Sequence, residues 1–397
     1  MTIVPKGYSF GVAAAGFKRP DRNDLGIIVS HGEASAAGVF TTNRFQAAPV
    51  LVCKELLAER PLARALLVSS GQANACTGAE GLANCRETLA IAATAAKALK
   101  IEPEDVLPTS TGVIGAQLKM DKWAAAAPQL AQSLGTASAM DVAKAMMTTD
   151  TFPKLVAKTL SLPGGEVRVL GMCKGAGMIS PKMATMLGFI LTDADVEPKD
   201  WQELLSSAAD RSFNALTVDG DTSTNDTVLA LANGASRVAV RDAKSLRLLR
   251  ACVTELCQEL SYRIVQDAEG GTKVAHITVR GAKSNAQAEL AARAIGNSPL
   301  VKTALFGCDP NWGRIVAALG RSGAEFEAEA VVLTIGGILV FEKGQPSPED
   351  LDGLLAPIMR HQDVAIELDL HAGRGSFTLL ASDLTKRYIE INADYRT

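Results

Sequence analysis

The chain has 397 residues, enough for two or three domains of ordinary size, or for one large layered unit with a smaller appendage. Its 40 basic and 43 acidic side chains nearly cancel, and no long block of like charge indicates a nucleic-acid partner. Seven cysteines without a CxxC pair, and four scattered histidines, indicate neither a disulfide framework nor a metal site. The N-terminus lacks the apolar segment of a signal peptide and no long apolar stretch follows, so we expect a cytoplasmic protein.

Apolar runs separated by glycine-rich turns predict strands and helices in mixed order. Up to residue 172, strands are expected at 24–30, 37–41, 64–69, 155–162 and 166–172, and helices at about 80–99, 121–134 and 139–147. Farther on, strands are expected at 185–191, 274–279, 300–306, 328–335, 337–342, 364–370 and 375–381, and helices at about 199–210, 243–262, 283–296 and 348–359. Strands outnumber helices without strict alternation, which predicts an α/β (α+β) layered fold with mixed sheets.

Three polar loops between these elements are candidates for binding or catalysis. Residues 70–78 precede a helix and could form a binding surface, although spacing alone favours a capping turn. Residues 108–115 carry hydroxyls and a glycine that can present donors to a developing negative charge. Residues 148–154 combine hydroxyl and carboxylate groups with a proline, which is typical of a turn but could equally hold the polar end of a small ligand.

Acidic residues in two further loops are weaker candidates. The loop 218–227 contains three aspartates but lacks the glycine and the final glutamate of an EF-hand, so it favours side-chain-to-backbone hydrogen bonds over a metal site. Glu269 stands beside two glycines and by itself predicts a solvated turn. The sequence Asp309-Pro310-Asn311 is typical of the start of a helix.

Thr185 opens an apolar run after a glycine-bearing segment that begins at Lys174. A threonine at such a place is usually only a β-branched strand former. Here the small Ala184 and the flexible residues before it would let the hydroxyl reach the carbonyl carbon upstream. After cleavage of that bond, Thr185 would carry an α-amino group with an unperturbed pKa of roughly 7.7 to 8, suited to act as the base for its own hydroxyl. The stretch therefore suggests an N-terminal threonine nucleophile.

Matches to one family are spread in order along the chain. They lie at 38–43 (GVFTTN), 70–78 (SGQANACTG), 110–115 (STGVIG), 148–154 (TTDTFPK), 174–179 (KGAGMI), 183–187 (MATML), 220–226 (GDTSTND), 268–273 (AEGGTK), 309–314 (DPNWGR) and 392–395 (NADY). On these segments the chain resembles the ornithine acetyltransferases of arginine biosynthesis, also called glutamate N-acetyltransferases. The resemblance covers essentially the whole sequence.

The resemblance implies an α-β-β-α sandwich of the ornithine acetyltransferase/DmpA type, with a main domain over 1–280 and a smaller α/β domain over 281–397. It implies autocatalytic cleavage between Ala184 and Thr185 into an α chain (1–184) and a β chain (185–397), which would associate as a heterotetramer of two α and two β chains. The acetyl group of N2-acetylornithine would pass to Thr185 and then to glutamate, a ping-pong transfer without a metal or organic cofactor. Acetyl-CoA would be a further substrate if the enzyme is bifunctional.

The family's functional residues map onto positions spread along the chain. Thr185 is the implied nucleophile, and Thr111 and Gly112 form the implied oxyanion hole. The implied substrate contacts are Thr151, Lys174, Thr185, Glu269, Asn392 and Thr397. We hypothesise that Lys174 pairs with the α-carboxylate of both substrates, and that Glu269 faces the cationic tail of ornithine. The second pairing has a difficulty, because glutamate would place a carboxylate there.

Two positions depart from the commoner pattern of the family. Gln72 stands where an asparagine is more usual, and Lys182 replaces an asparagine three residues before the nucleophile. Neither change removes a catalytic group, so cleavage is still expected. Two alternatives stay open: a related N-terminal-nucleophile amidohydrolase or aminopeptidase that transfers the acyl group to water, and a non-catalytic binding protein that keeps the fold.

Overall fold

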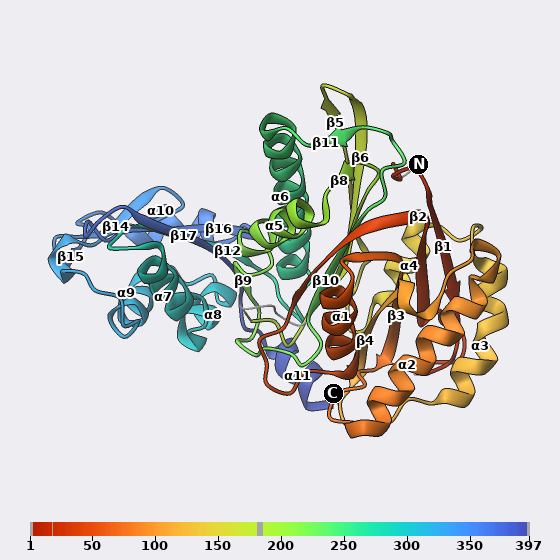
Figure 1. Cartoon of the computed structure of the whole chain (residues 1–397). Coiled ribbons are helices and arrows are strands. Elements are labelled where there is room, and N and C mark those ends of the chain that lie inside the picture. Colours follow the sequence, from red (N-terminus) through yellow and green to blue (C-terminus); the bar gives the residue numbers. More distant parts are fainter. Residues whose placement is uncertain (1–2, 18, 181–185, 395–397) are drawn as a thin grey trace.

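The computed structural model describes residues 3–17, 19–180 and 186–394. Within them, a large sheet has the strand order β4-β3-β2-β10-β7-β6-β5, with β1 paired to β2 (Figure 1). Its strands are β1 (Tyr8–Ala13), β2 (Leu25–Phe40), β3 (Leu62–Gln72), β4 (Val106–Val113), β5 (Lys154–Leu162), β6 (Gly165–Lys174), β7 (Leu187–Thr192) and β10 (Thr227–Ala232).

The long strand β2 divides this sheet into two halves. Its first part pairs with β1 and β3, its last part pairs with β10, and the register shifts between Val29 and Ala34. The two halves pack face to face, because Ile28 and Leu66 from one half share a buried apolar cluster with Phe189 and Leu231 from the other. Alternate residues of each strand point away from this cluster, as the period of two in a strand requires.

Helices cover the two outer faces of these half-sheets. On one side lie α1 (Ala48–Glu59), α2 (Gly78–Ala95) and α3 (Met120–Ser133), and on the other lie α5 (Pro198–Asp210) and α6 (Ala243–Gln266). The helix α4 (Ala139–Met146) packs into the cluster between the half-sheets. The layers therefore run helix, sheet, sheet, helix, which confirms the predicted α-β-β-α sandwich.

A second sheet, shown mostly in blue in Figure 1, lies beside this sandwich. Its order is β15-β14-β13-β16-β12-β17-β9. These strands are β9 (Leu216–Thr217), β12 (Val274–Ala282), β13 (Val332–Ile335), β14 (Ile338–Glu342), β15 (Gln345–Pro346), β16 (Asp363–Asp369) and β17 (Gly375–Ser382). The helices α7 (Asn285–Gly296), α8 (Pro299–Phe306), α9 (Trp312–Gly320) and α10 (Leu351–Met359) contribute to one separate core with it.

The chain passes between this sheet and the sandwich more than once. Strand β9 stands in the sequence between α5 and β10 of the sandwich, and β12 follows α6. After β17, the final helix α11 (Lys386–Asp394) returns to the sandwich, where Tyr388 and Asn392 line a cavity. The domain division into 1–280 and 281–397 stays a prediction. A short pair, β8 (Asp195–Val196) with β11 (Ala239–Val240), lies outside both sheets.

Several predicted elements differ from the structure. The strand expected at 300–306 is wrong, because these residues form α8: the Ser298 side chain caps the helix and Pro299 occupies its first turn. The strands expected at 24–30 and 37–41 are parts of one strand, and 328–330 form a 3-10 turn before β13. Asn311 caps α9, as its sequence predicts. Among the described residues, no helix combines the length and apolar character needed to span a membrane.

Candidate functional site

A cavity of about 230 Å³ lies where the ends of β4 and β6 meet several loops and α11. It brings together five of the residues that the sequence singles out: Thr111, Gly112, Lys174, Glu269 and Asn392. The other lining residues are Ala73, Ile114, Thr148, Thr149, Gly177, Met178, Asp219, Asp221, Ser223, Thr224, Asn225 and Tyr388. The predicted cleavage site Ala184–Thr185, the substituted Lys182 and the predicted contact Thr397 lie outside the described residues.

Thr111 and Gly112 form one corner of the cavity at the end of β4. Gly112 has φ +133°, and a Cβ atom there would lie 2.3 Å from the carbonyl carbon of Gly71 on β3, so this close approach requires glycine. The side-chain amide of Asn225, in the loop 218–227, stabilises this corner by donating to the carbonyls of Ala73 at 2.6 Å and Ser110 at 2.9 Å. The corner is therefore held by the backbone of three segments, as a preorganised donor site requires.

Lys174 ends strand β6 and is only 3% exposed. Its side chain lines the cavity, and no hydrogen bond or ion pair joins its ammonium to another described residue. The next residue, Gly175, donates its backbone N–H to Asp150 Oδ1 at 2.7 Å. Lys174 is therefore held by its backbone while its charge stays available to an anion.

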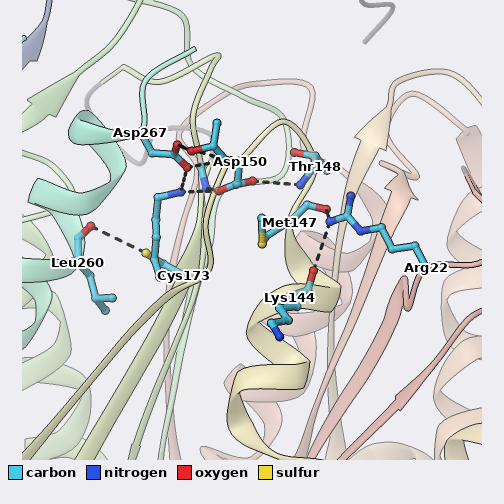
Figure 2. A network of polar contacts seen from close by, with 11 residues as sticks. Arg22, Lys144, Met147, Thr148, Asp150, Cys173, Leu260 and Asp267 are labelled. Atoms are coloured by element: carbon cyan, nitrogen blue, oxygen red, sulfur yellow. Dashed lines mark hydrogen bonds and ion pairs between the residues drawn. The ribbon is translucent and has the colours of Figure 1, made fainter. Parts of the chain in front are cut away.

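A buried ion cluster adjoins the segment that holds Lys174, and Figure 2 shows two of its members, Asp150 and Asp267. The Lys154 ammonium contacts Asp150 Oδ1 at 2.7 Å and Asp267 Oδ2 at 2.5 Å, with the Lys154 and Asp150 side chains fully buried. Burial alone would raise the pKa of Asp150, but the charges of Lys174 and Lys154 outweigh it and lower that pKa to about 2. Asp150 also accepts from the Thr148 backbone at 3.0 Å. The cluster thus fixes the cavity wall.

Thr151 belongs to this cluster and does not line the cavity. Its hydroxyl donates to Asp267, and its backbone N–H lies 3.0 Å from Asp267 Oδ2. The structure therefore separates Thr151 from the other described residues that the resemblance identifies as substrate contacts. Its hydroxyl is already used within the protein, as a turn or cap residue would use it.

Glu269 and Asn392 approach the cavity from two segments that are distant in sequence. The Asn392 amide donates to Glu269 Oε2 at 2.9 Å. The Glu269 backbone N–H donates to the Ala176 carbonyl at 2.9 Å, which places the carboxylate across Gly177. A Cβ atom on Gly177 would lie 2.3 Å from Glu269 Oε2, so only glycine leaves room for this side chain. Glu269 is therefore a cavity residue, which its own sequence neighbourhood did not predict.

The loop 218–227 binds backbone groups through its aspartates, as its sequence predicts. Asp219 accepts the N–H groups of Met178 at 2.6 Å and Ile179 at 2.8 Å, and the Tyr388 hydroxyl lies 3.3 Å from it. Asp226 is fully buried and accepts the N–H of Met186 at 3.0 Å. Burial raises the pKa of Asp226 well above its ordinary value. Within the described residues, no group of three or more His, Cys, Asp or Glu side chains is placed to hold a metal ion.

Sequence reasoning missed two residues that build the site, Asp267 and Asn225, and did not identify the partner of Asp226. Asp226 and Asn225 lie in a loop that the sequence singled out as polar, but their partners come from other strands. Asp267 lies immediately after α6, and only its isolated charge beside the Glu269 segment could have drawn attention to it. Such long-range partners are not encoded in local spacing.

A model of the ArgJ family matches residues 9–397. The chain belongs to the ArgJ family.

Relatives of this ArgJ-family chain match along its whole length. The arginine biosynthesis bifunctional protein ArgJ of Nitratidesulfovibrio vulgaris is 55% identical over 397 residues, with 100% of each chain covered. The protein of the same name from Geobacter sulfurreducens is 44% identical over 394 residues, 99% of each chain. The solved structure of arginine biosynthesis bifunctional protein ArgJ from Bacillus halodurans is 35% identical with a TM-score of 0.50, covering 52% of this chain and 98% of that one.

Proposed function

We propose that this ArgJ-family chain is an acetyltransferase of arginine biosynthesis that moves the acetyl group of N2-acetyl-L-ornithine to L-glutamate. The observation that carries the proposal is one cavity that combines a buried cation, Lys174, which has no hydrogen bond or ion pair to another described residue, with a carboxylate, Glu269, and the Thr111–Gly112 corner. An acetylated amino acid with a carboxylate and a cationic tail is complementary to such a cavity. The family and the names of its relatives support the same pathway.

The proposed nucleophile is Thr185, freed at its α-amino group by cleavage of the bond to Ala184. Its hydroxyl attacks the acetyl carbon, and the oxygen that becomes negative is stabilised by Thr111 and the backbone N–H of Gly112. Ornithine leaves, and the amino group of glutamate then takes the acetyl group from the threonine ester. The ester stores the group between the two steps, so we propose that no metal or organic cofactor takes part.

Lys174 serves both half-reactions, since both substrates carry an α-carboxylate. Glu269 faces the ornithine tail, and Asn392, whose amide contacts Glu269, supplies a donor for the side-chain carboxylate of glutamate. Thr397 is a further proposed substrate contact. Thr151, whose hydroxyl bonds to Asp267, is proposed to act at the edge of the substrate site.

The mature enzyme is proposed to be a cytoplasmic heterotetramer of two α chains (1–184) and two β chains (185–397). The proposed pieces cannot function separately, because the α chain carries Thr111, Gly112 and Lys174 whereas the β chain carries Glu269 and Asn392. We further propose that acetyl-CoA serves as a second acetyl donor, in keeping with the word "bifunctional" in the names of the relatives.

An acetyl-transfer assay tests the proposal. Purified protein is incubated with acetylornithine, with and without glutamate, and acetylglutamate, ornithine and acetate are measured. Glutamate-dependent formation of acetylglutamate in step with ornithine release is expected. Release of acetate at the same rate with or without glutamate would instead identify a hydrolase.

A further inference from the structure

A second cavity, of about 210 Å³, shares Thr148 with the substrate cavity. It is lined by two arginines, Arg19 and Arg22, and by Gly71 on β3. Gly71 lies beside Gly112 in the parallel pairing of β3 and β4, so the two cavities flank the same corner of the sheet. We call this second space the arginine cavity.

The charge available in the arginine cavity is positive. Its two carboxylates are already engaged: Asp24 accepts the N–H groups of Ala15 and Phe17, each at 2.7 Å, and Asp150 pairs with Lys154. Arg19 is exposed, and no hydrogen bond or ion pair joins its guanidinium to another described residue. An anion that enters this cavity would therefore meet a cation that has no partner among the described residues.

Arg22 lines the same cavity as Arg19 and is held in place. Its Nη2 donates to the carbonyls of Met147 at 2.6 Å and Lys144 at 3.3 Å (Figure 2), and Met147 and Thr148 line the same cavity. Because both contacts use one terminal nitrogen, the other donors of the guanidinium stay available. A fixed arginine in the same cavity as an exposed one is suited to phosphate, which arginine binds through paired hydrogen bonds.

We propose that the arginine cavity binds the phosphate-bearing part of an acetyl thioester, so that acetyl-CoA delivers its acetyl group to the substrate cavity from this side. This proposal rests on the proposed function, because it assigns the arginine cavity to acetyl-CoA, the second acetyl donor proposed there. Acetylornithine carries no phosphate, so only one of the two donors uses the cavity.

The chemical step is the same for both donors. The Thr185 hydroxyl oxygen forms a bond to the acetyl carbon, and the carbon–sulfur bond of the thioester breaks. The hydroxyl proton passes through the α-amino group of Thr185 to the departing thiolate, which leaves as the coenzyme A thiol. No oxidant or further reactant is needed, and the threonine ester then acetylates glutamate.

The test compares two donors in Arg19→Glu, which changes an exposed residue without described partners. With acetyl-CoA and glutamate, KM for acetyl-CoA is expected to rise at least about 10-fold, the effect of losing a charge-assisted contact. With acetylornithine and glutamate, kcat and KM should stay at the wild-type values. Arg250→Glu, an exposed charge reversal on α6 that lines neither cavity, is the matched control and should change neither reaction.

A truncated donor sharpens this comparison. S-acetylpantetheine keeps the thioester but lacks the nucleotide phosphates, so its KM should be the same for wild type and Arg19→Glu. Arg22→Gln provides a second variant with the same expected selectivity. Equal changes for all donors, or none for acetyl-CoA in either variant, would overturn the proposal.

Binding measurements separate this inference from the proposed function. If the wild type does not turn over acetyl-CoA, the proposal that acetyl-CoA is a second acetyl donor is wrong. Calorimetry with coenzyme A then tests separately whether the arginine cavity binds phosphate groups. Coenzyme A binding that weakens in Arg19→Glu but not in Arg250→Glu would support a phosphate site. Absence of binding to the wild type, or equal binding to the wild type and Arg19→Glu, would overturn it.

Discussion

The backbone N–H of Met186 donates a hydrogen bond to Asp226 Oδ1 at 3.0 Å, inside the protein. Met186 follows Thr185 directly in the sequence, so this bond anchors the chain one residue after the proposed nucleophile. The second oxygen of Asp226 has no hydrogen-bond partner among the described residues. Burial without a partner for one of its oxygens raises the pKa of this carboxyl well above its ordinary value.

The first prediction concerns the charge of Asp226. Its folded pKa is raised above the unfolded value of about 3.9, so its contribution to stability is fully present below that pH and is lost as pH rises toward the folded pKa. Asp226→Asn keeps an acceptor for Met186 without the titration, so its unfolding free energy relative to wild type should increase from pH 4 upward. Urea denaturation across pH 4–8 measures this; a relative free energy that falls with pH would contradict it.

The removal of the Asp226 acceptor has a different expected result. Asp226→Ala leaves the buried Met186 N–H without its partner, which costs about 1–3 kcal/mol. Denaturation of Asp226→Ala and Asp226→Asn at one pH separates the hydrogen bond from the charge. Equal stability of the two variants would mean that the bond contributes little.

The buried cation Lys154 is predicted to hold two carboxylates in place. Lys154→Met removes the partner of Asp150 and Asp267 and should lower the unfolding free energy by about 3–5 kcal/mol, since unpaired charges then stay buried. Lys158→Met is the matched control on the same strand, because its ammonium pairs with an exposed glutamate. The control should change stability by about 1 kcal/mol or less. Similar losses in both variants would contradict the role of Lys154.

The depressed pKa of Asp150 predicts acid sensitivity. Its folded pKa of about 2 lies below the unfolded value of about 3.9, so the stability that it contributes is present above the unfolded pKa and is lost as pH falls toward 2. The stability difference between wild type and Asp150→Asn should therefore shrink between pH 5 and pH 2. Parallel denaturation curves at several pH values measure it, and a constant difference would count against this ionisation.

The proposed oxyanion corner predicts a loss of turnover without loss of fold. Thr111→Val keeps the shape of the side chain but removes its hydroxyl, and kcat should fall about 10²- to 10³-fold. The fold should be retained, since no described hydrogen bond depends on that hydroxyl. Steady-state kinetics with acetylornithine and glutamate, together with circular dichroism, check both parts. Wild-type kcat in Thr111→Val would exclude its hydroxyl from catalysis.

The sequence predicted the layered fold because alternation and turn residues act locally. The prediction of a strand at 300–306 was wrong, because an apolar run of this length fits a strand or a helix equally well. The side chain of Ser298, which caps the first turn, favours the helix. The resemblance identified the five cavity residues at the described positions, whereas local reading of Glu269 favoured a solvated turn. Behind them, Lys154 pairs with Asp267, which lies 113 positions away in the sequence, and no local pattern predicts such a contact.

The proposed mechanism depends most directly on Thr185, which is expected to gain a free α-amino group by self-cleavage of the chain and then to carry the acetyl group on its hydroxyl. Purified protein is incubated with acetylornithine in the absence of glutamate, quenched in acid and analysed by intact mass and peptide mapping. We predict two fragments, 1–184 and 185–397, with one acetyl group on Thr185 of the second fragment that disappears when glutamate is added. A full-length chain that stays uncleaved, or a cleaved enzyme that transfers acetyl without ever carrying it on Thr185, would contradict the account.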